Sequence, residues 1–257
     1  MTPYSQPLYY EIAFSFFDVK KQCDLIEKFI RKYSTVPVKR CLDIACGPSL
    51  QNRELARRGY HCIGLDKSRV MLNYLREKAR ENKLKIETVK SDMCDFTVGK
   101  IGGKVDLALM MMGSISLIES NDRMLSHLES VARCLKKGGL YLIENAEADW
   151  AKEDFFGSQT WTSERDGISI ETTYKLELKD TLKQAAVATI ILEVNDHGSE
   201  FYFEESRDIK IFFPQEFVAL IEKCGKFEFL GWFEPDRMKK LSKAKENNLV
   251  VLAYRTL

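Results

Sequence analysis

Short apolar segments alternate with amphipathic helices over the first part of this 257-residue chain, and this alternation constrains the fold most strongly. The segments carry apolar residues on both faces, and we expect strands at 40–45, 60–65, 84–89, 105–112 and 140–143. Between them, residues with apolar side chains on one face predict helices at 21–33, 68–82 and 122–135. A further helix is expected after the turn at 46–49 and ends at Arg58. Such strands are typical of a parallel sheet covered on each side. The pattern therefore predicts a doubly wound, mostly parallel α/β domain.

The pattern changes after residue 154, where longer β-rich segments replace the helices. Three segments, 168–178, 184–194 and 200–213, are joined by turn-like sequences of hairpin length, and they predict a three-stranded antiparallel β meander. A helix from Pro214 to Cys224 and strands at 227–233 and 249–254 then resume the first pattern, so the meander is an insertion. We therefore expect an N-terminal helical segment and α/β core at 1–154, the meander at 155–213, and completion of the sheet by 214–257.

Composition limits the partners and the compartment. The 39 Lys and Arg residues balance 38 Asp and Glu residues, so a net charge of +1 gives no support for a nucleic-acid or membrane partner. No apolar run reaches the roughly 18 to 20 residues that cross a bilayer, and the first residues lack the order of a secretory signal. Seven scattered cysteines without a C-x-x-C pair predict reduced thiols in a cytoplasmic protein. Three histidines leave little for a zinc site, and we expect no bound metal.

Small and acidic residues follow three of the expected strands. The segment 43–49, Asp-Ile-Ala-Cys-Gly-Pro-Ser, ends the first strand and opens a helix, which lets backbone N–H groups approach a ligand. Asp66 ends the second strand, where a carboxylate can accept hydrogen bonds from both hydroxyls of a ribose. Asp92 follows the third strand and can accept from an adenine amino group, while Met93 and Met71 can flank the ring. The order of these residues favours a ligand that contains adenosine.

Taken together, these motifs resemble those of the class I S-adenosylmethionine-dependent methyltransferases. The likeness covers about residues 41–144, includes Leu-Lys-Lys-Gly-Gly-Leu-Tyr-Leu at 135–142, and resumes in the last forty residues. It is closer to the small-molecule branch with a β insertion after the fifth strand, which includes amino-sugar and glycine-type N-methyltransferases. The resemblance implies a seven-stranded sheet with an antiparallel last strand, S-adenosylmethionine as cofactor and S-adenosylhomocysteine as product. It assigns cofactor binding to Tyr10, Asp43, Ala45, Cys46, Gly47, Asp66, Lys67, Met71, Asp92, Met93, Met110 and Met111.

The sequence departs from the family pattern at several positions. Ala45 and Ser49 stand where the first motif usually has glycine. Residues 110–114, Met-Met-Met-Gly-Ser, replace the Asn-Pro-Pro-Tyr-like motif of nucleic-acid amino-methyltransferases, so base methylation by that route is not expected. Leu117 stands near a position where many small-molecule relatives have Tyr or His, which puts a polar base there in doubt. A nicotinamide dinucleotide fits less well, because Ala-x-Gly-x-Ser lacks the glycines that its pyrophosphate needs.

The residues on the acceptor side have two interpretations each. Tyr9 and Tyr10 either fold over the cofactor as a lid or pack against the first helix, and Glu144 and Asn145 either contact an acceptor or end a strand in solvent. No catalytic residue is identified, and Tyr10 and Glu144 are the candidates. An aromatic group either walls an acceptor pocket or, as we favour, fills the seam between sheet and meander: Trp150, Phe155, Phe156 and Trp161.

Histidines and a basic run contribute little to the expected site. No catalytic role is expected for His61, His127 or His197, and His127 is predicted to be a hydrogen-bonded core residue. The basic run predicts a solvated loop or, alternatively, a site for an acidic acceptor or partner, and comprises Arg237, Lys239, Lys240, Lys243 and Lys245.

Methyl transfer from a sulfonium is an in-line displacement that needs positioning more than covalent help. We therefore predict a methyltransferase of small molecules that acts mainly by positioning, with N-methylation slightly favoured over O-methylation. Two alternatives stay open: methylation of protein or RNA, which a basic groove would favour, and a non-catalytic S-adenosylmethionine-binding protein with a filled acceptor pocket. The edge strands of the meander must be covered or paired, which predicts a homodimer through it.

Overall fold

A seven-stranded sheet forms the larger part of the computed structural model, which describes residues 2–146, 155–242 and 248–254. Its strand order is β10-β11-β5-β4-β1-β2-β3. The first five strands are parallel, and β11 runs antiparallel between β5 and β10. The strand bounds are β1 Arg40–Ile44, β2 His61–Asp66, β3 Ile86–Lys90, β4 Val105–Met110, β5 Leu135–Glu144, β10 Phe227–Phe233 and β11 Leu249–Tyr254. The predicted doubly wound α/β fold is confirmed.

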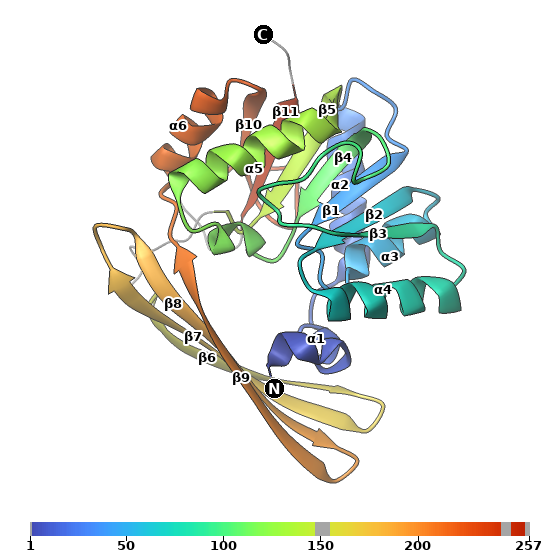
Figure 1. Ribbon diagram of the computed structural model, residues 1–257, viewed down its shortest axis with the longest axis vertical. Coiled ribbons are helices and arrows are strands. Elements are labelled where there is room, and N and C mark those ends of the chain that lie inside the picture. Colours follow the sequence, from blue (N-terminus) through green and yellow to red (C-terminus); the bar gives the residue numbers. More distant parts are fainter. Residues whose placement is uncertain (1, 147–154, 243–247, 255–257) are drawn as a thin grey trace.

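Helices cover both faces of this sheet (Figure 1). One face packs against α2 (Val19–Tyr33), α3 (Leu50–Arg57) and α4 (Arg69–Glu81), and the other against α5 (Asn121–Cys134) and α6 (Pro214–Cys224). Side-chain caps fix several helix starts, as where Ser68 accepts the N–H of Met71 and Ser120 accepts that of Arg123. β5 is longer than expected, because Leu135 already pairs with Val105 of β4 instead of extending the helix before it.

The second sheet contains four strands and not the three that were expected. Its order is β6 (Gly157–Arg165), β7 (Ile168–Asp180), β8 (Ala185–Asp196) and β9 (Ser199–Lys210), all antiparallel. The extra strand, β6, reads Gly-Ser-Gln-Thr-Trp-Thr-Ser-Glu-Arg and is mostly exposed on both faces. It has no apolar alternation that could have predicted it.

The N-terminal segment lies between the two sheets (Figure 1). It forms a short turn, η1 (Pro3–Ser5), and one helix, α1 (Pro7–Ala13). Ile12 and Ala13 are completely buried in a cluster with apolar residues of β7, β8 and β9. A further turn, η2 (Ser114–Leu117), follows β4 and contacts the meander through Leu117. The space between the sheets is therefore filled by segments from the start and the middle of the chain.

His127, on α5, is completely buried in the core, as the sequence predicts. Its Nδ1 hydrogen-bonds the carbonyl of Met93 (2.7 Å) and its Nε2 hydrogen-bonds the hydroxyl of Tyr141 (2.7 Å). Burial lowers the pKa of His127 to about 4, so the ring is neutral at neutral pH. The histidine thereby ties α5 to β5 and to the loop after β3.

Two findings bear on the environment of the chain. All seven cysteines are free thiols, and six of them are buried. Among the residues that the structure describes, we find no helix with the length and apolar character to cross a bilayer.

Candidate functional site

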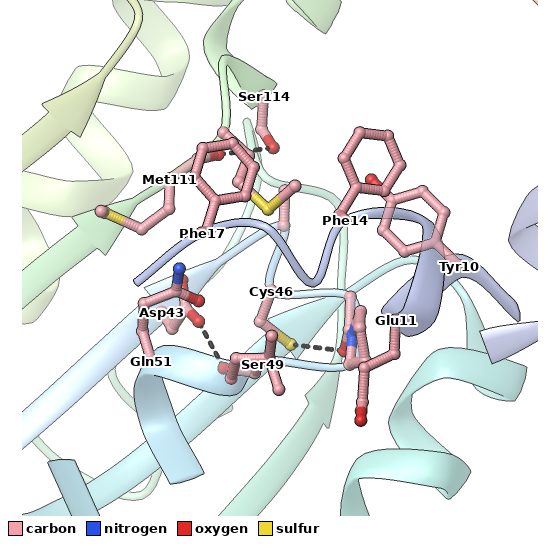
Figure 2. A pocket seen from close by; sticks show the side chains of 15 residues that line it. Tyr10, Glu11, Phe14, Phe17, Asp43, Cys46, Ser49, Gln51, Met111 and Ser114 are labelled. Atoms are coloured by element: carbon pink, nitrogen blue, oxygen red, sulfur yellow. Dashed lines mark hydrogen bonds between the residues drawn. The ribbon is translucent and has the colours of Figure 1, made fainter. Parts of the chain in front are cut away.

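A pocket opens at the carboxyl ends of β1 and β4, beneath the N-terminal segment (Figure 2). The space within the pocket, counted together with the part open to solvent, is about 550 Å³. The carboxyl edge of a parallel sheet is where ligands bind in open α/β folds. The lining comes from β1 and the loop after it (Asp43 and 45–51), from the end of β4 (Met111, Met112 and Ser114) and from the N-terminal segment (Tyr10, Glu11, Phe14 and Phe17).

The loop after β1 turns sharply because three of its residues have left-handed backbones. Ala45, Gly47 and Ser49 have φ angles of 54°, 51° and 48°. Glycine adopts this conformation without strain, whereas Ala45 and Ser49 are strained there. The two positions where the sequence departs from the glycine pattern are thus positions where the backbone favours glycine. α3 begins directly after the loop, so the unpaired N–H groups of its first turn lie at the pocket.

Asp43 lies at the floor of the pocket, where it is almost completely buried. Its carboxylate accepts a hydrogen bond from the Ser49 hydroxyl. Burial raises the pKa of Asp43 to about 7, although the Ser49 hydrogen bond acts in the opposite direction. A cationic ligand in the pocket would favour the ionised form of this carboxyl group.

Asp66, at the end of β2, is tied to the same loop. Its Oδ2 accepts the N–H of Gly47 (2.8 Å), and its Oδ1 accepts the N–H of Ser68 (2.7 Å). Each carboxylate oxygen has a further lone pair available, so the group can still accept two ligand hydroxyls. Gly64 in the same strand lets the loop after β1 pack closely against β2, since a Cβ at this position would lie 2.9 Å from Sγ of Cys46.

Four further residues that were predicted to bind the cofactor do not line the pocket. Asp92 accepts the N–H of Cys94 (2.7 Å) and pairs with Arg123 (2.8 Å). Met93 is half-buried beside it, Met71 is buried and Lys67 is exposed. Six predicted residues line the pocket, namely Tyr10, Asp43, Ala45, Cys46, Gly47 and Met111.

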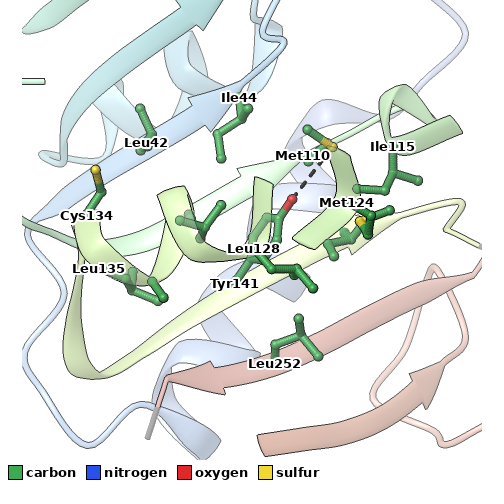
Figure 3. Packing of buried hydrophobic residues seen from close by; sticks show 14 of the residues in the cluster. Leu42, Ile44, Met110, Ile115, Met124, Leu128, Cys134, Leu135, Tyr141 and Leu252 are labelled. Atoms are coloured by element: carbon green, nitrogen blue, oxygen red, sulfur yellow. Dashed lines mark hydrogen bonds between the residues drawn. The ribbon is translucent and has the colours of Figure 1, made fainter. Parts of the chain in front are cut away.

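Met110 does not line the pocket either. Its side chain is completely buried in the core, where Sδ lies 3.6 Å from the hydroxyl oxygen of Tyr141 (Figure 3). Alternation along β4 explains the difference, because Met110 and Met111 point to opposite faces of the sheet.

Glu144 joins three elements and does not line the pocket. One oxygen accepts the side-chain amide of Gln22 (2.9 Å), and the other accepts the N–H of Met112 (2.8 Å). Burial raises the pKa of Glu144. Asn145 pairs with Asn248 through backbone and side-chain hydrogen bonds of 2.7 and 3.2 Å. Both residues therefore anchor the end of β5, which differs from the acceptor contact and from the solvated strand end that were considered.

The two N-terminal tyrosines point in different directions. The Tyr10 ring lies over the pocket and packs against Phe14, with 4.7 Å between ring centroids (Figure 2). The Tyr9 hydroxyl instead donates to Asp196 of the meander (2.7 Å). Only Tyr10 thus has the position that a lid over the pocket requires.

Glu11 fastens α1 on two sides. Its carboxylate pairs with Arg53 of α3 (2.6 Å) and with Arg165 of β6 (2.7 Å), and it is only 3% exposed. The carbonyl of Ala13 accepts a further hydrogen bond from the indole N–H of Trp161 in β6 (2.7 Å). Helix α1 is thereby fixed between α3 and the β6 strand of the meander.

Several lining residues were not predicted from the sequence. Glu11, Phe14 and Phe17 reach the pocket through long-range contacts that no local pattern reveals. Met112 and Ser114 follow β4 directly, so the rule that ligands bind at strand carboxyl ends could have found them.

The remaining aromatic and basic residues that were considered for the site do not line the pocket. Phe155 and Phe156 pack against the cluster of Leu117 and the meander, and Trp161 packs against Phe14 and Phe16, so these three rings lie in the seam. Trp150 lies outside the described residues, as do Lys243 and Lys245. In the described part of the basic run, Arg237 and Lys239 pair with Glu234 (2.8 and 3.2 Å). The other two histidines lie at the surface, His61 beside Glu87 (2.7 Å) and His197 in a turn.

Comparisons with known proteins agree with this geometry. Residues 41–139 match a family described as a methyltransferase domain. A protein of Geobacillus sp. (strain WCH70) with a methyltransferase name is 23% identical over 159 residues, and the match spans 62% of this chain and 63% of that relative's length.

Solved structures share the fold over almost the whole chain. An S-adenosylmethionine-dependent methyltransferase from Clostridium acetobutylicum ATCC 824 has a TM-score of 0.80 at 19% identity, and the match covers 96% of both chains. A sugar N-methyltransferase from Streptoalloteichus sp. ATCC 53650 has a TM-score of 0.70 at 18% identity, covering 93% of this chain and 88% of the other. The predicted family and cofactor class agree with these matches. Residues 41–139 therefore match a methyltransferase-domain family, and the chain has the fold of solved S-adenosylmethionine-dependent methyltransferases.

Proposed function

We propose that the protein transfers a methyl group from S-adenosylmethionine to a small-molecule amine. The observation that carries the proposal is the joining of Asp66 to the left-handed loop at 45–49, in a methyltransferase domain whose pocket opens beside that loop. When bound, the cofactor would supply the methyl group on a positively charged sulfur.

The residues present fit this cofactor. Asp66 would accept the ribose hydroxyls, and Asp92 and Met93 would hold the adenine. Asp43 offers a carboxylate to a cationic ligand, and the backbone of Ala45 and Gly47 lies at the pocket without bulky side chains. Tyr10, Phe14 and Phe17 would exclude water and place aromatic faces near a positive charge.

The charge of the pocket favours an amine over an acidic acceptor. Among the described residues that line it there is no lysine or arginine, Asp43 is acidic, and Glu11 is already paired with Arg53 and Arg165 outside the lining. This lining supports N-methylation over methylation of a carboxylate, and gives no support to an RNA or acidic protein substrate. The likeness to a sugar N-methyltransferase points the same way.

We infer that the reaction uses no general base. Glu144, the acidic candidate, uses both oxygens to hold Gln22 and Met112. Catalysis would thus rest on holding the amine in line with the methyl group, which by itself can lower a barrier by about 7 kcal/mol or more. The amine would arrive without its proton, because only the neutral form has the nucleophilic lone pair.

Calorimetric titration with S-adenosylmethionine and S-adenosylhomocysteine tests the cofactor site. We expect micromolar binding to the wild type and a loss of about tenfold or more, roughly 1.4 kcal/mol, in Asp66→Ala. Asp208→Ala is a matched control, since Asp208 is exposed on the meander and, among the residues that the structure describes, pairs with Lys179 alone. Failure of both ligands to bind the wild type would exclude this function and would leave the fold alone.

We also propose that the protein is cytoplasmic, as its seven free thiols suggest, and that it forms a homodimer. β9 is an edge strand of the meander, and it exposes Phe201 and Tyr202. An unpaired edge with exposed aromatic residues is a natural pairing surface. Sedimentation equilibrium should show a dimer that Tyr202→Glu dissociates, whereas a monomeric wild type would refute the pairing.

A further inference from the structure

A chain of three hydrogen bonds leads from the end of β5 to the wall of the pocket. The two oxygens of Glu144 accept the N–H of Met112 (2.8 Å) and the side-chain amide of Gln22 (2.9 Å). Oε1 of Gln22 accepts in turn from Nε2 of Gln51 (3.0 Å). Met112 and Gln51 both line the pocket, so each end of the chain reaches it. The chain thereby links β5, α2 and α3 to the site.

Glu144 determines the direction of this chain. It is only 6% exposed, and an ionised carboxylate accepts hydrogen bonds but cannot donate them. Gln22 must therefore turn its NH₂ group toward Glu144, which leaves its carbonyl oxygen for Gln51. Gln51 must then turn its own NH₂ group toward Gln22. The charge at one end of the chain thus fixes the orientation of two neutral amides that could otherwise flip.

The carbonyl oxygen of Gln51 is the free end of the chain. This oxygen accepts no hydrogen bond within residues 2–146, 155–242 and 248–254, and it is not sealed in the protein interior. Gln51 lines the pocket (Figure 2), so the oxygen is open to a ligand there. Asp43 lines the same pocket and offers a carboxylate. The wall therefore presents two acceptor groups to the ligand.

We propose that Glu144 and Gln22 are positioning residues that set the polarity of the pocket wall at Gln51. They hold the Gln51 carbonyl oxygen toward the ligand, where it faces a positively charged group of S-adenosylmethionine. Glu144 acts only through Gln22, and it does not line the pocket. The inference rests on the proposed function, because it concerns the same cofactor. It deepens that function by naming the residues through which the pocket selects a positively charged ligand.

Glu144→Gln is expected to reverse the chain without removing a hydrogen bond. The introduced amide must still accept the N–H of Met112, so its NH₂ group faces Gln22 and donates to the Gln22 carbonyl oxygen. Gln22 then donates to Gln51, and the NH₂ group of Gln51 turns toward the ligand. The wall would present a donor where the native wall presents an acceptor. We expect calorimetric titration to show a loss of about tenfold or more in affinity for S-adenosylmethionine.

Adding Gln22→Glu should restore the native direction. In Glu144→Gln/Gln22→Glu the carboxylate moves one position along the chain, where it accepts from the introduced amide on one side and from Gln51 on the other. The Gln51 carbonyl oxygen then faces the ligand again. The double variant has the same composition and net charge as the wild type. We expect its affinity for S-adenosylmethionine to lie within about threefold of the wild-type value.

A control ligand and a control variant separate polarity from general damage. The ligand is 5′-methylthioadenosine, which has the adenosine and the sulfur but neither positive charge of S-adenosylmethionine. Its affinity should change less than about twofold in Glu144→Gln. The control variant is Glu81→Gln, since Glu81 is exposed at the end of α4 and pairs with Lys78 (3.0 Å). It should leave both affinities unchanged.

A further variant tests the end of the chain without altering Glu144. Gln51→Ala removes the carbonyl oxygen itself, and we expect it to weaken S-adenosylmethionine binding about tenfold. In this background Glu144→Gln should cause no additional loss, because the amide that it would reverse is absent. Urea denaturation shows whether each variant is folded, and Gln51→Ala decides the question if Glu144→Gln is not.

The outcomes separate the two possible failures. A wild type that binds neither S-adenosylmethionine nor S-adenosylhomocysteine would refute the proposed function. Normal binding by the wild type, together with unchanged affinity in Glu144→Gln or in Gln51→Ala, would refute the role of the chain alone. So would equal losses for S-adenosylmethionine and 5′-methylthioadenosine in Glu144→Gln, or a double variant that binds as weakly as Glu144→Gln.

Discussion

The two walls of the pocket are built from contacts of different range. On the cofactor wall, Asp43 bonds Ser49, six residues away, and Asp66 bonds Gly47, 19 residues away. On the opposite wall, Glu11 pairs with Arg165 across 154 residues, and Tyr9 bonds Asp196 across 187. The first wall is a local motif that β1, the loop after it and the end of β2 specify. The second wall exists only when the N-terminal helix meets the meander.

The largest effect is expected where the two walls are joined. Glu11→Ala leaves Arg53 partly buried without its partner, and breaking a buried ion pair costs about 3 to 5 kcal/mol. We expect a fall of at least about 3 kcal/mol in the free energy of unfolding by urea denaturation. Glu87→Ala, which removes an exposed pair with His61, should cost less than about 1 kcal/mol. Equal, small effects of both substitutions would mean that the ion pairs of Glu11 do not hold the walls together.

A second substitution measures how much the buried hydrogen bonds of His127 contribute to the stability of the main sheet. His127→Leu leaves the Met93 carbonyl without its side-chain donor and leaves the Tyr141 hydroxyl with only the weak contact to Sδ of Met110, at a cost of about 2 to 3 kcal/mol at neutral pH. The pKa of His127 falls to about 4 on folding, below its unfolded value, so its contribution is complete above the unfolded pKa.

The same linkage predicts the pH dependence of stability. As the pH falls from about 6.5 toward 4, the wild type should lose this contribution and approach the stability of His127→Leu. Denaturation at several pH values measures the difference, and His61→Leu serves as a surface control. A difference between wild type and His127→Leu that is constant over this range would contradict the linkage.

A third prediction concerns the charge on the pocket floor. The pKa of Asp43 is about 7 in the folded protein, and a cationic ligand favours its ionised form. The affinity for S-adenosylmethionine should therefore rise as the pH increases toward 7, and should be constant above it. Asp43→Asn should lower the affinity about tenfold at about pH 8 and remove this dependence. Calorimetric titration at several pH values measures the affinity for S-adenosylmethionine. A pH profile of this affinity in Asp43→Asn that is the same as in the wild type would refute the role of the charge.

The smallest effect is expected at the loop itself. Ala45 has a left-handed backbone, so Ala45→Gly should relieve strain, while the more flexible unfolded chain opposes the gain. The two terms nearly cancel, and we expect a change in unfolding free energy within about 1 kcal/mol. Ala56→Gly, inside helix α3, should instead destabilise by about 1 kcal/mol. A large loss in Ala45→Gly would show that the alanine methyl group has a packing role.

The difference between the walls also explains what the sequence could predict. Strands that are apolar on both faces revealed the main sheet, and the small residues at 45–49 with Asp66 revealed the loop that they form together. β6 could not be predicted, because its side chains are polar and mostly exposed on both faces. Glu11 could not be predicted either, since its partners Arg53 and Arg165 are distant in the chain. Met110 shows a third limit, in which three consecutive methionines conceal the face that each one takes.

The anchoring of α1 has a consequence for the order in which the molecule can be made. The helix is synthesised before the meander, since the indole of Trp161 that holds its last carbonyl comes 148 residues later, and Asp196 comes later still. Until the meander has been synthesised, the N-terminal residues lack the partners that they bond in the folded protein. Contacts of such separation are slow to form because the closing loop loses much chain entropy. The cofactor motif can therefore fold early during translation, whereas the cover of the pocket is among the last parts to be completed.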